Sequence, residues 1–177
     1  MTITIRAEEA GDAQLIESAV KSAYADVAYS DHREHLMVER LRGTDAFVPA
    51  LSLLAEKAGK IVGHVLLTKA LITREQIAVV SLALAPLSVV PEHQGQGVGR
   101  SLIAEAHRRA AELGFNSIVL VGIPDYYPQF GYKPLSAYPI TLPFEAPPAN
   151  CMILALAPDA LRGVSGRVQY APGWMEH

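Results

Sequence analysis

The chain has 177 residues, of which 50% are hydrophobic and 19% are charged, and its formal net charge is −3 at pH 7. This length suits a single domain over residues 1–177 with a substantial buried core, and the composition excludes a disordered chain. The slight negative charge gives no reason to expect a nucleic acid or an anionic membrane as a partner.

The cysteine content and the N-terminus indicate the compartment. The single cysteine, Cys151, excludes an internal disulfide framework. The opening Met-Thr-Ile-Thr-Ile-Arg lacks the layout of a signal peptide. The longest apolar-rich run, residues 77–90, is shorter than the roughly 20 residues that a membrane span needs. We therefore expect a soluble, cytoplasmic protein with no membrane partner.

The first predicted elements are a strand and two helices. Ile3 and Ile5 alternate with polar residues, as in a strand. Asp12 is expected to cap a helix that runs to about Tyr24. The apolar face of this helix would comprise Leu15, Ile16, Ala19, Val20 and Ala23. A second helix is predicted for residues 32–41. Its inward residues would be Leu36, Met37, Arg40 and Leu41.

The middle of the chain predicts a hairpin followed by a long strand. The hairpin comprises residues 51–56 and 60–68 and turns at residues 57–59. Residues 77–90 are almost wholly apolar, so we expect this strand to be buried on both faces. Pro86 cannot donate to a ladder, which favours a bulge or an unpaired edge. A strand that ends at Ala85 and restarts is the alternative.

The second half of the chain continues the alternation of helices and strands. A helix is predicted after residue 98, and Gly114 is its stop signal. Its buried side would comprise Leu102, Ile103, Ala106, Ala110 and Leu113. Residues 117–123 and 151–156 are predicted strands, and the proline-rich stretch 139–148 is a predicted loop or edge.

A glycine-rich loop, residues 94–101, joins the long strand to the helix that follows it. Its glycines let the backbone turn, and amides at a helix start can bind a phosphate. A Rossmann fingerprint fails because its third glycine is Arg100 here. A P-loop fails because Gln94 replaces its first glycine and an arginine replaces its lysine. The pattern Gln/Arg-x-x-Gly-x-Gly/Ala fits Gln94, Gly97 and Gly99 in every slot.

With this loop between a strand and a helix, the chain resembles the GNAT superfamily of acetyl-CoA-dependent N-acetyltransferases. It is most similar to small bacterial acetyltransferases that carry a Tyr-Tyr-x-x-Phe-Gly-Phe segment, here residues 126–132. The resemblance extends from Ile3 to about Tyr170. It implies an α/β fold with a mixed central sheet and flanking helices, in which two splayed parallel strands form the acetyl-CoA cleft.

The resemblance also implies the site that holds acetyl-CoA, the acetyl donor. The loop would bind the pyrophosphate of CoA, and the preceding strand would offer backbone groups to the pantetheine arm. The implied cofactor-binding residues are Leu87, Ser88, Val89, Gln94, Gly95, Gln96, Gly97, Val98, Gly99, Arg100, Ser101, Asp125 and Phe130. No group of His, Cys or carboxylate residues has metal-ligand spacing, so no metal is expected.

Tyr127 is the implied catalytic residue, because a tyrosine at this place in the family often faces the cofactor sulfur as a general acid. A thiol titrates near 8.5 and a tyrosine near 10, so full proton transfer costs roughly 2 kcal/mol. A hydrogen bond that strengthens as charge grows on sulfur is therefore favoured. Packing at the end of the sheet is the alternative role. Asp125 could cap a helical turn around Tyr127, and Gly131 could end it.

No general base is evident. Many relatives place a carboxylate on the strand beside the cofactor, where this chain has the apolar residues 82–85. The candidate substitutes are Asp31, His32, Glu34 and His35. A water relay is equally open, and a weakly basic amine needs no strong base. His64 is expected to be a core histidine, and Cys151 to be inert.

The predicted function is direct transfer of an acetyl group from acetyl-CoA to an amine in a ternary complex. A non-catalytic acyl-CoA-binding or regulatory module is one alternative, and a protein that binds ATP or NAD through the same loop is another. Dimers are common in similar proteins, so a homodimer is considered. Loops around residues 24–31, 73–76 and 137–150 are expected to set the acceptor, which the sequence does not identify.

Overall fold

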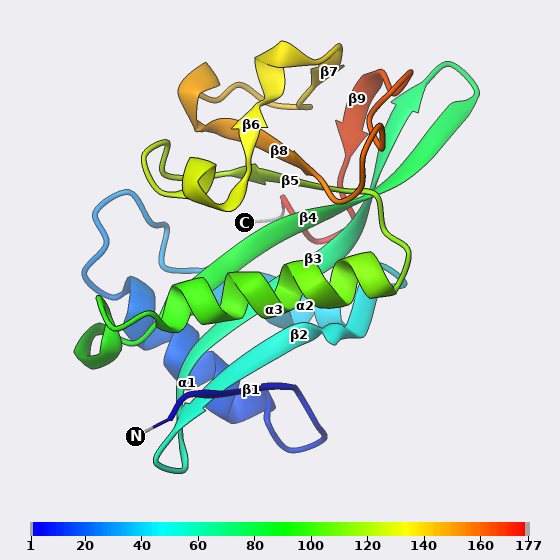
Figure 1. Cartoon of the computed structure of the whole chain (residues 1–177). Coiled ribbons are helices and arrows are strands. Elements are labelled where there is room, and N and C mark those ends of the chain that lie inside the picture. The colour runs from blue at the N-terminus through cyan, green and yellow to red at the C-terminus, as the bar shows by residue number, and fades with distance from the viewer. Residues whose placement is uncertain (1, 176–177) are drawn as a thin grey trace.

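The structure is a computed structural model that describes residues 2–175. It holds one mixed sheet with the strand order β1-β2-β3-β4-β5-β8-β6, while β9 pairs with β3 and with β7 (Figure 1). The strands are β1 (Thr4–Ala7), β2 (Phe47–Lys57), β3 (Lys60–Arg74), β4 (Ile77–Val89), β5 (Ser117–Val121), β6 (Lys133–Pro134), β7 (Ile140–Thr141), β8 (Cys151–Ala155) and β9 (Gly166–Gln169).

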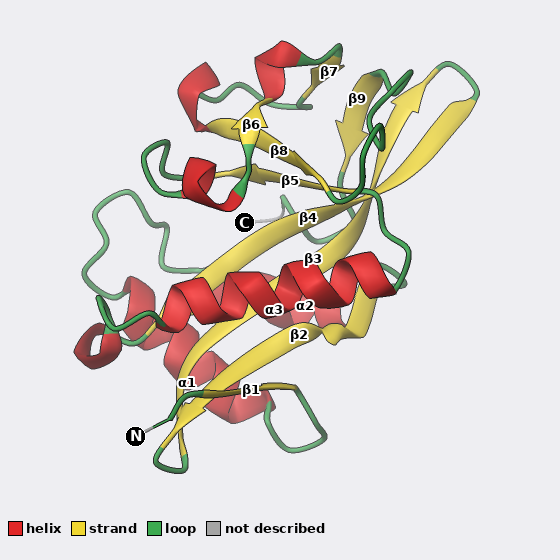
Figure 2. Cartoon of the chain, viewed as in Figure 1, coloured by secondary structure: helices red, strands yellow, loops and turns green. Residues whose placement is uncertain are grey.

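Helices cover both faces of the sheet, as Figure 2 shows. The α-helices are α1 (Ala13–Tyr24), α2 (Glu34–Arg42) and α3 (Val98–Glu112). Short 3₁₀ turns are η1 (Pro91–His93), η2 (Tyr127–Phe130), η3 (Leu135–Ala137) and η4 (Pro148–Asn150). One core forms where α3 packs on β2, β3 and β4, and another forms on the opposite face under α1 and α2. The amphipathic pattern of each helix accounts for this layering.

The strands β4 and β5 run parallel but separate soon after they meet. Their register contains only the pairs Leu82–Ile118 and Ala83–Val119. Beyond these pairs, β4 stays bonded to β3, and β5 stays bonded to β8. The predicted splayed parallel strands are thus present.

A bulge lies in β4 just after the strands separate. Leu84 pairs with Leu67 and Leu87 pairs with Val65, so Ala85 and Pro86 together oppose one residue of β3. This confirms the bulge predicted at Pro86. Side chains alternate along a strand, and the extra residue shifts that alternation. Leu84 and Leu87 consequently both pack in the core under α3, which turns Ser88 toward the α1 face.

Several sequence expectations about burial were wrong. The start of β4 is not buried, because Ile77 is 66% exposed and Val80 is 47% exposed. This end of the β3–β4 hairpin projects from the molecule (Figure 1), and β4 has β3 as its partner there. On the helices, Leu15 and Leu36 are exposed, whereas Val38 takes an inward position that was not expected.

The predicted capping role of Asp12 was also wrong. Asp12 occupies the N-cap position of α1 but makes no side-chain cap hydrogen bond. Its carboxylate instead accepts a hydrogen bond from the backbone N–H of Glu9 at 2.7 Å. It also accepts two hydrogen bonds from the Arg6 guanidinium, at 2.7 and 3.1 Å. Arg6 lowers the pKa of the Asp12 carboxyl. The Arg6 ion pair therefore competes successfully with the local cap.

Candidate functional site

The glycine loop turns into α3 in the predicted way. Gly95 and Gly97 have positive φ angles of 74° and 85°, and a Cβ at either position would meet no atom within 4 Å. These glycines are therefore required by backbone conformation and not by crowding. The first N–H groups of a helix have no partner inside it, so the α3 N-terminus presents donors to a ligand.

Side chains tie this loop to the sheet. Gln94 Nε2 donates to the carbonyl of Val89 at 3.0 Å, which joins the loop to the end of β4. Lys57 Nζ donates to Gln96 Oε1 at 3.0 Å from the β2–β3 turn. The glutamine of the motif thus has a structural task here, because it fixes the loop against the splayed strand.

A cavity of ≈ 880 Å³ extends from this loop between the ends of β4, β5 and α1. The predicted cofactor-binding residues that line it are Leu87, Val89, Gln94, Gly95, residues 97–100 and Phe130. Tyr127 lines it as well. The structure therefore brings the loop, the bulged strand and the predicted catalytic tyrosine to one cavity.

Four predicted cofactor-binding residues do not line the cavity. The bulge directs Ser88 to the α1 face, and its side chain is buried there. Gln96 is exposed and reaches Lys57. Ser101 lies within α3, where its N–H donates to the carbonyl of Gly97. Asp125 is exposed and does not cap η2, whose N-cap position is taken by Tyr126.

Arg100 lies at the cavity edge in contact with residues of η2. Its Nη2 donates to Gln129 Oε1 at 2.6 Å, and its guanidinium carbon is 5.4 Å from the centre of the Phe130 ring. These contacts hold a positive charge beside the loop, and such a charge suits an anionic ligand.

Tyr127 is buried at the end of β5. Its ring packs so closely on Gly122 that a Cβ there would lie 2.4 Å from Tyr127 Cε2. Tyr126 and Tyr132 contact the ring edge-on, with centroids 5.1 and 5.7 Å away. Burial raises the pKa of the Tyr127 phenol above its ordinary value. The phenol is therefore neutral near pH 7 and can donate a hydrogen bond. As predicted, Gly131 ends η2 with a φ of 98°.

Three further tyrosines that were not predicted as site residues line the cavity: Tyr24, Tyr29 and Tyr126. Tyr24 ends α1, and Tyr29 follows in the next loop. The Tyr24 hydroxyl donates to the carbonyl of Leu87 at 2.9 Å, across the bulged part of β4. Burial raises the pKa of Tyr24. The available signal was an aromatic residue at the end of an amphipathic helix, just before the loop expected to shape the acceptor pocket.

The candidate bases from the sequence lie outside this cavity. His32 is exposed, with Nδ1 2.9 Å from the carbonyl oxygen of Tyr24. Asp31 accepts the N–H of Arg33, and Glu34 accepts the Ser30 hydroxyl. His35 lines a separate small hollow between α1 and α2. Among residues 2–175, none of these four side chains lines the cavity.

The comparisons with known proteins identify the family. Residues 49–134 match the family model described as Acetyltransferase (GNAT) domain. The chain is 35% identical over 130 residues to YjhQ of Escherichia coli K12, an N-acetyltransferase described as uncharacterized, and the match covers 72% of each chain. The chain belongs to the GNAT acetyltransferase family. The sequence-based family assignment is thereby confirmed.

Other GNAT proteins match almost the full length. The uncharacterized N-acetyltransferase YhbS of E. coli K12 is 28% identical over 94% of this chain and 95% of its own. The crystal structure of YhbS with CoA superposes with a TM-score of 0.88 at 25% identity, covering 98% of this chain and 92% of that one. A Brucella melitensis GNAT acetyltransferase with acetyl-CoA has a TM-score of 0.78 at 31% identity, covering 98% of both chains. These matches confirm the predicted GNAT fold.

Residues 2–175 contain no group of three or more His, Cys, Asp or Glu side chains that could hold a metal ion. None of the helices in that range has the length and apolar character needed to cross a membrane.

Proposed function

We propose that this GNAT protein transfers the acetyl group of acetyl-CoA directly to an amine. One observation carries the proposal: the ≈ 880 Å³ cavity runs from the N-terminus of α3 to Tyr127, between two strands that have separated. The YhbS structure with CoA and the Brucella structure with acetyl-CoA support the choice of donor.

Binding of acetyl-CoA would use backbone groups at both ends of the cavity. The pyrophosphate would accept N–H groups of residues 95–100, where the helix dipole favours an anion. The pantetheine arm would lie along residues 87–89, where β4 has no β5 partner. Buried backbone groups need partners, and an amide-bearing arm supplies them.

The reaction replaces a C–S bond with a C–N bond and transfers one proton. The neutral amine attacks the thioester carbonyl, a C–N bond forms, and the C–S bond breaks with its electron pair on sulfur. The nitrogen loses one proton and the thiolate gains one, so the products are the amide and the CoA thiol. Tyr127 donates a hydrogen bond to that sulfur as its charge grows. An alkyl amine with a pKa near 10.4 must first lose a proton, which costs roughly 4 to 5 kcal/mol at pH 7. A proton acceptor is therefore needed for strongly basic acceptors.

Thiol release with a panel of amines tests the proposal. The Tyr127→Phe variant should bind acetyl-CoA as the wild type does and lose turnover at least tenfold. Tyr138→Phe is the matched control, because Tyr138 packs in a different core. Calorimetric titration with acetyl-CoA, ATP and NAD shows which of these ligands the protein binds. Unchanged turnover in Tyr127→Phe would remove this residue from the mechanism.

A non-catalytic acyl-CoA-binding module is the second candidate. One observation favours it: no Asp or Glu is among the described residues that line the cavity. Tight acetyl-CoA binding without thiol release, for any amine in the panel, would support this module and contradict the transferase.

A further inference from the structure

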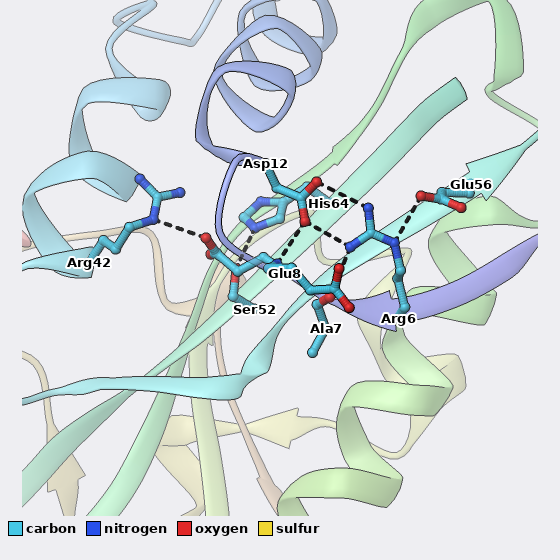
Figure 3. Close-up of polar contacts among 9 residues, drawn as sticks. Arg6, Ala7, Glu8, Asp12, Arg42, Ser52, Glu56 and His64 are labelled. Atoms are coloured by element: carbon cyan, nitrogen blue, oxygen red, sulfur yellow. Dashed lines mark hydrogen bonds and ion pairs between the residues drawn. The ribbon is translucent and has the colours of Figure 1, made fainter. Parts of the chain in front are cut away.

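A row of polar side chains crosses the sheet beneath α1 and α2. It comprises Glu8, Ser52, His64, Ser88 and Tyr24, which come from the residue after β1, from β2, β3 and β4, and from the end of α1. Figure 3 shows the first part of the row, in which Glu8, Ser52 and His64 point toward one another. Ser52, His64 and Ser88 are each at most 1% exposed. Polar groups this deep in an apolar core need partners or a function.

The hydrogen bonds fix which nitrogen of His64 carries the proton. Ser52 Oγ donates its only proton to Glu8 Oε1. Ser52 Oγ also lies 3.0 Å from His64 Nε2, so that contact requires Nε2–H as the donor. Arg42 Nε holds the other oxygen of Glu8 at 3.0 Å, which keeps the carboxylate an acceptor. His64 Nδ1 is therefore a bare lone pair.

Burial keeps this imidazole uncharged at rest. It lowers the pKa of His64 to about 3, and the nearby Arg42 contributes to the lowering. Charged groups near the row include Arg42, which pairs with both Glu8 and Glu39. Beyond them, Arg6 pairs with Asp12 and Glu56 (Figure 3). Glu34 lies near its other end, where its charge contributes to raising the pKa of Tyr24.

The row continues from His64 toward the cavity. His64 and Ser88 are directly opposite on β3 and β4, where Cβ atoms are about 5 Å apart. His64 Nδ1 and Ser88 Oγ are both buried without a partner among the described residues. One is an acceptor and the other a donor. The Tyr24 hydroxyl donates to the carbonyl of Leu87, the residue next to Ser88, and Tyr24 lines the cavity.

We propose that this row carries the proton of the acceptor amine out of the cavity, toward Glu8. The amine N–H bond breaks, and its proton goes to the Tyr24 oxygen. The Tyr24 O–H, which donates to the Leu87 carbonyl at rest, turns and passes its own proton to Ser88. Ser88 passes its own proton to His64 Nδ1, Nε2 gives one to Ser52, and Ser52 gives one to Glu8. The amine loses one proton, the Glu8 carboxylate gains one, and every group between keeps its count.

This inference rests on the proposed function and gives the proton a carboxylate acceptor outside the cavity, whose lining contains His93 but no Asp or Glu. Tyr24 contacts the substrate space, whereas Ser88, His64 and Ser52 act through it as positioning residues. The side chain of Glu8 is 9% exposed, against at most 1% for Ser52, His64 and Ser88, so the proton ends nearer to solvent than the interior of the row. Burial of the remaining groups keeps bulk water from competing with the transfer.

The test uses the full-length protein, acetyl-CoA and two amines. One amine is an alkyl amine that is protonated at pH 7, and the other is an aromatic amine that is neutral. In Ser88→Ala, kcat for the alkyl amine at pH 7 should fall about 100-fold, which is the low end of general acid–base effects. For the aromatic amine, kcat should fall less than threefold, and KM for acetyl-CoA should not change. Raising the pH should restore kcat for the alkyl amine, because more of this amine is then already neutral.

Controls separate the relay from packing. Ser81→Ala removes another buried serine of β4, one that bonds Ser117 outside the row. It should not change the ratio of the kcat values for the two amines. Ser52→Ala breaks the row beyond His64 and should reproduce the Ser88→Ala pattern. Equal losses for both amines in Ser88→Ala, or no loss for either, would contradict the relay.

One measurement needs no activity. Nitrogen NMR of the wild-type protein should show His64 neutral, with its proton on Nε2, from pH 5 to 8. A proton on Nδ1 would contradict the relay. Wild-type protein that turns over no amine would contradict the proposed function, and the relay with it. An active wild type with an insensitive Ser88→Ala would contradict the relay alone.

Discussion

Gly122 permits the position of Tyr127, so replacing it tests whether that position matters. In Gly122→Ala, the added Cβ would lie 2.4 Å from Tyr127 Cε2 and 3.0 Å from Cδ2, against an ordinary contact of 3.4 Å or more. The ring must move by about 1 Å to relieve this overlap. A shift of about 1 Å in a catalytic group can cost about 100-fold in rate, or roughly 2.7 kcal/mol of barrier. Overpacking should also cost about 1–3 kcal/mol of unfolding free energy.

The assay is thiol release at saturating acetyl-CoA, beside thermal unfolding. Gly43→Ala is the matched control, because a Cβ there meets Arg40 O at an ordinary 3.6 Å. It should keep wild-type kcat. Combining Gly122→Ala with Tyr127→Phe should be no slower than Tyr127→Phe alone, since both act through one phenol. Additive losses in the double variant, or unchanged kcat in Gly122→Ala, would refute the assigned position of Tyr127.

Two further predictions concern stability. Burial lowers the pKa of His64 to about 3 and that of His107 to about 4. An unfolded histidine titrates near 6.5, so unfolding takes up protons between these values and the protein loses stability as the pH falls below 6.5. At pH 5 the free energy of unfolding, measured with urea, should be lower by about 2 kcal/mol for each histidine. His107→Gln should remove the part of this loss that is due to His107. A free energy of unfolding that does not change between pH 7 and 5 would contradict the burial argument. Gly63→Ala should destabilise by about 1–3 kcal/mol in the same assay, because its Cβ would lie 2.9 Å from both Ser88 O and Val98 Cγ1; wild-type stability would show that β3 and α3 can separate there.

Local chemistry explains what could be predicted from the sequence. The loop from Gln94 to Gly99 contains both the glycines that let it turn and the backbone N–H groups that can bind an anion. Its role could therefore be predicted from consecutive residues. The bulge was predictable because Pro86 alone forbids a regular ladder. Tyr127 was singled out by the family resemblance, from its place four residues before Gly131, and the structure puts it in the same cavity as the loop. Its catalytic role stays a prediction.

The rest depends on contacts between distant segments. Whether Ile77 is buried depends on how far the β3–β4 hairpin extends past its neighbours, which no local pattern states. His64 was expected in the core, but its bond to Ser52 and the contact of Ser52 with Glu8 join β3, β2 and the segment that follows β1. Tyr24 reaches Leu87 across 63 positions of sequence. Periodicity identifies the face on which such residues lie, but not the residues that they contact.

The extra residue at Ala85–Pro86 makes the length of β4 as important as its composition. Deleting either residue would exchange the two faces from residue 87 onward, so that Ser88 would enter the core under α3 and Leu87 would meet Tyr24. Every later side chain of the strand would be misdirected without a single amino acid type having changed. A redesign of this protein must therefore preserve the residue count between Leu84 and Ser88.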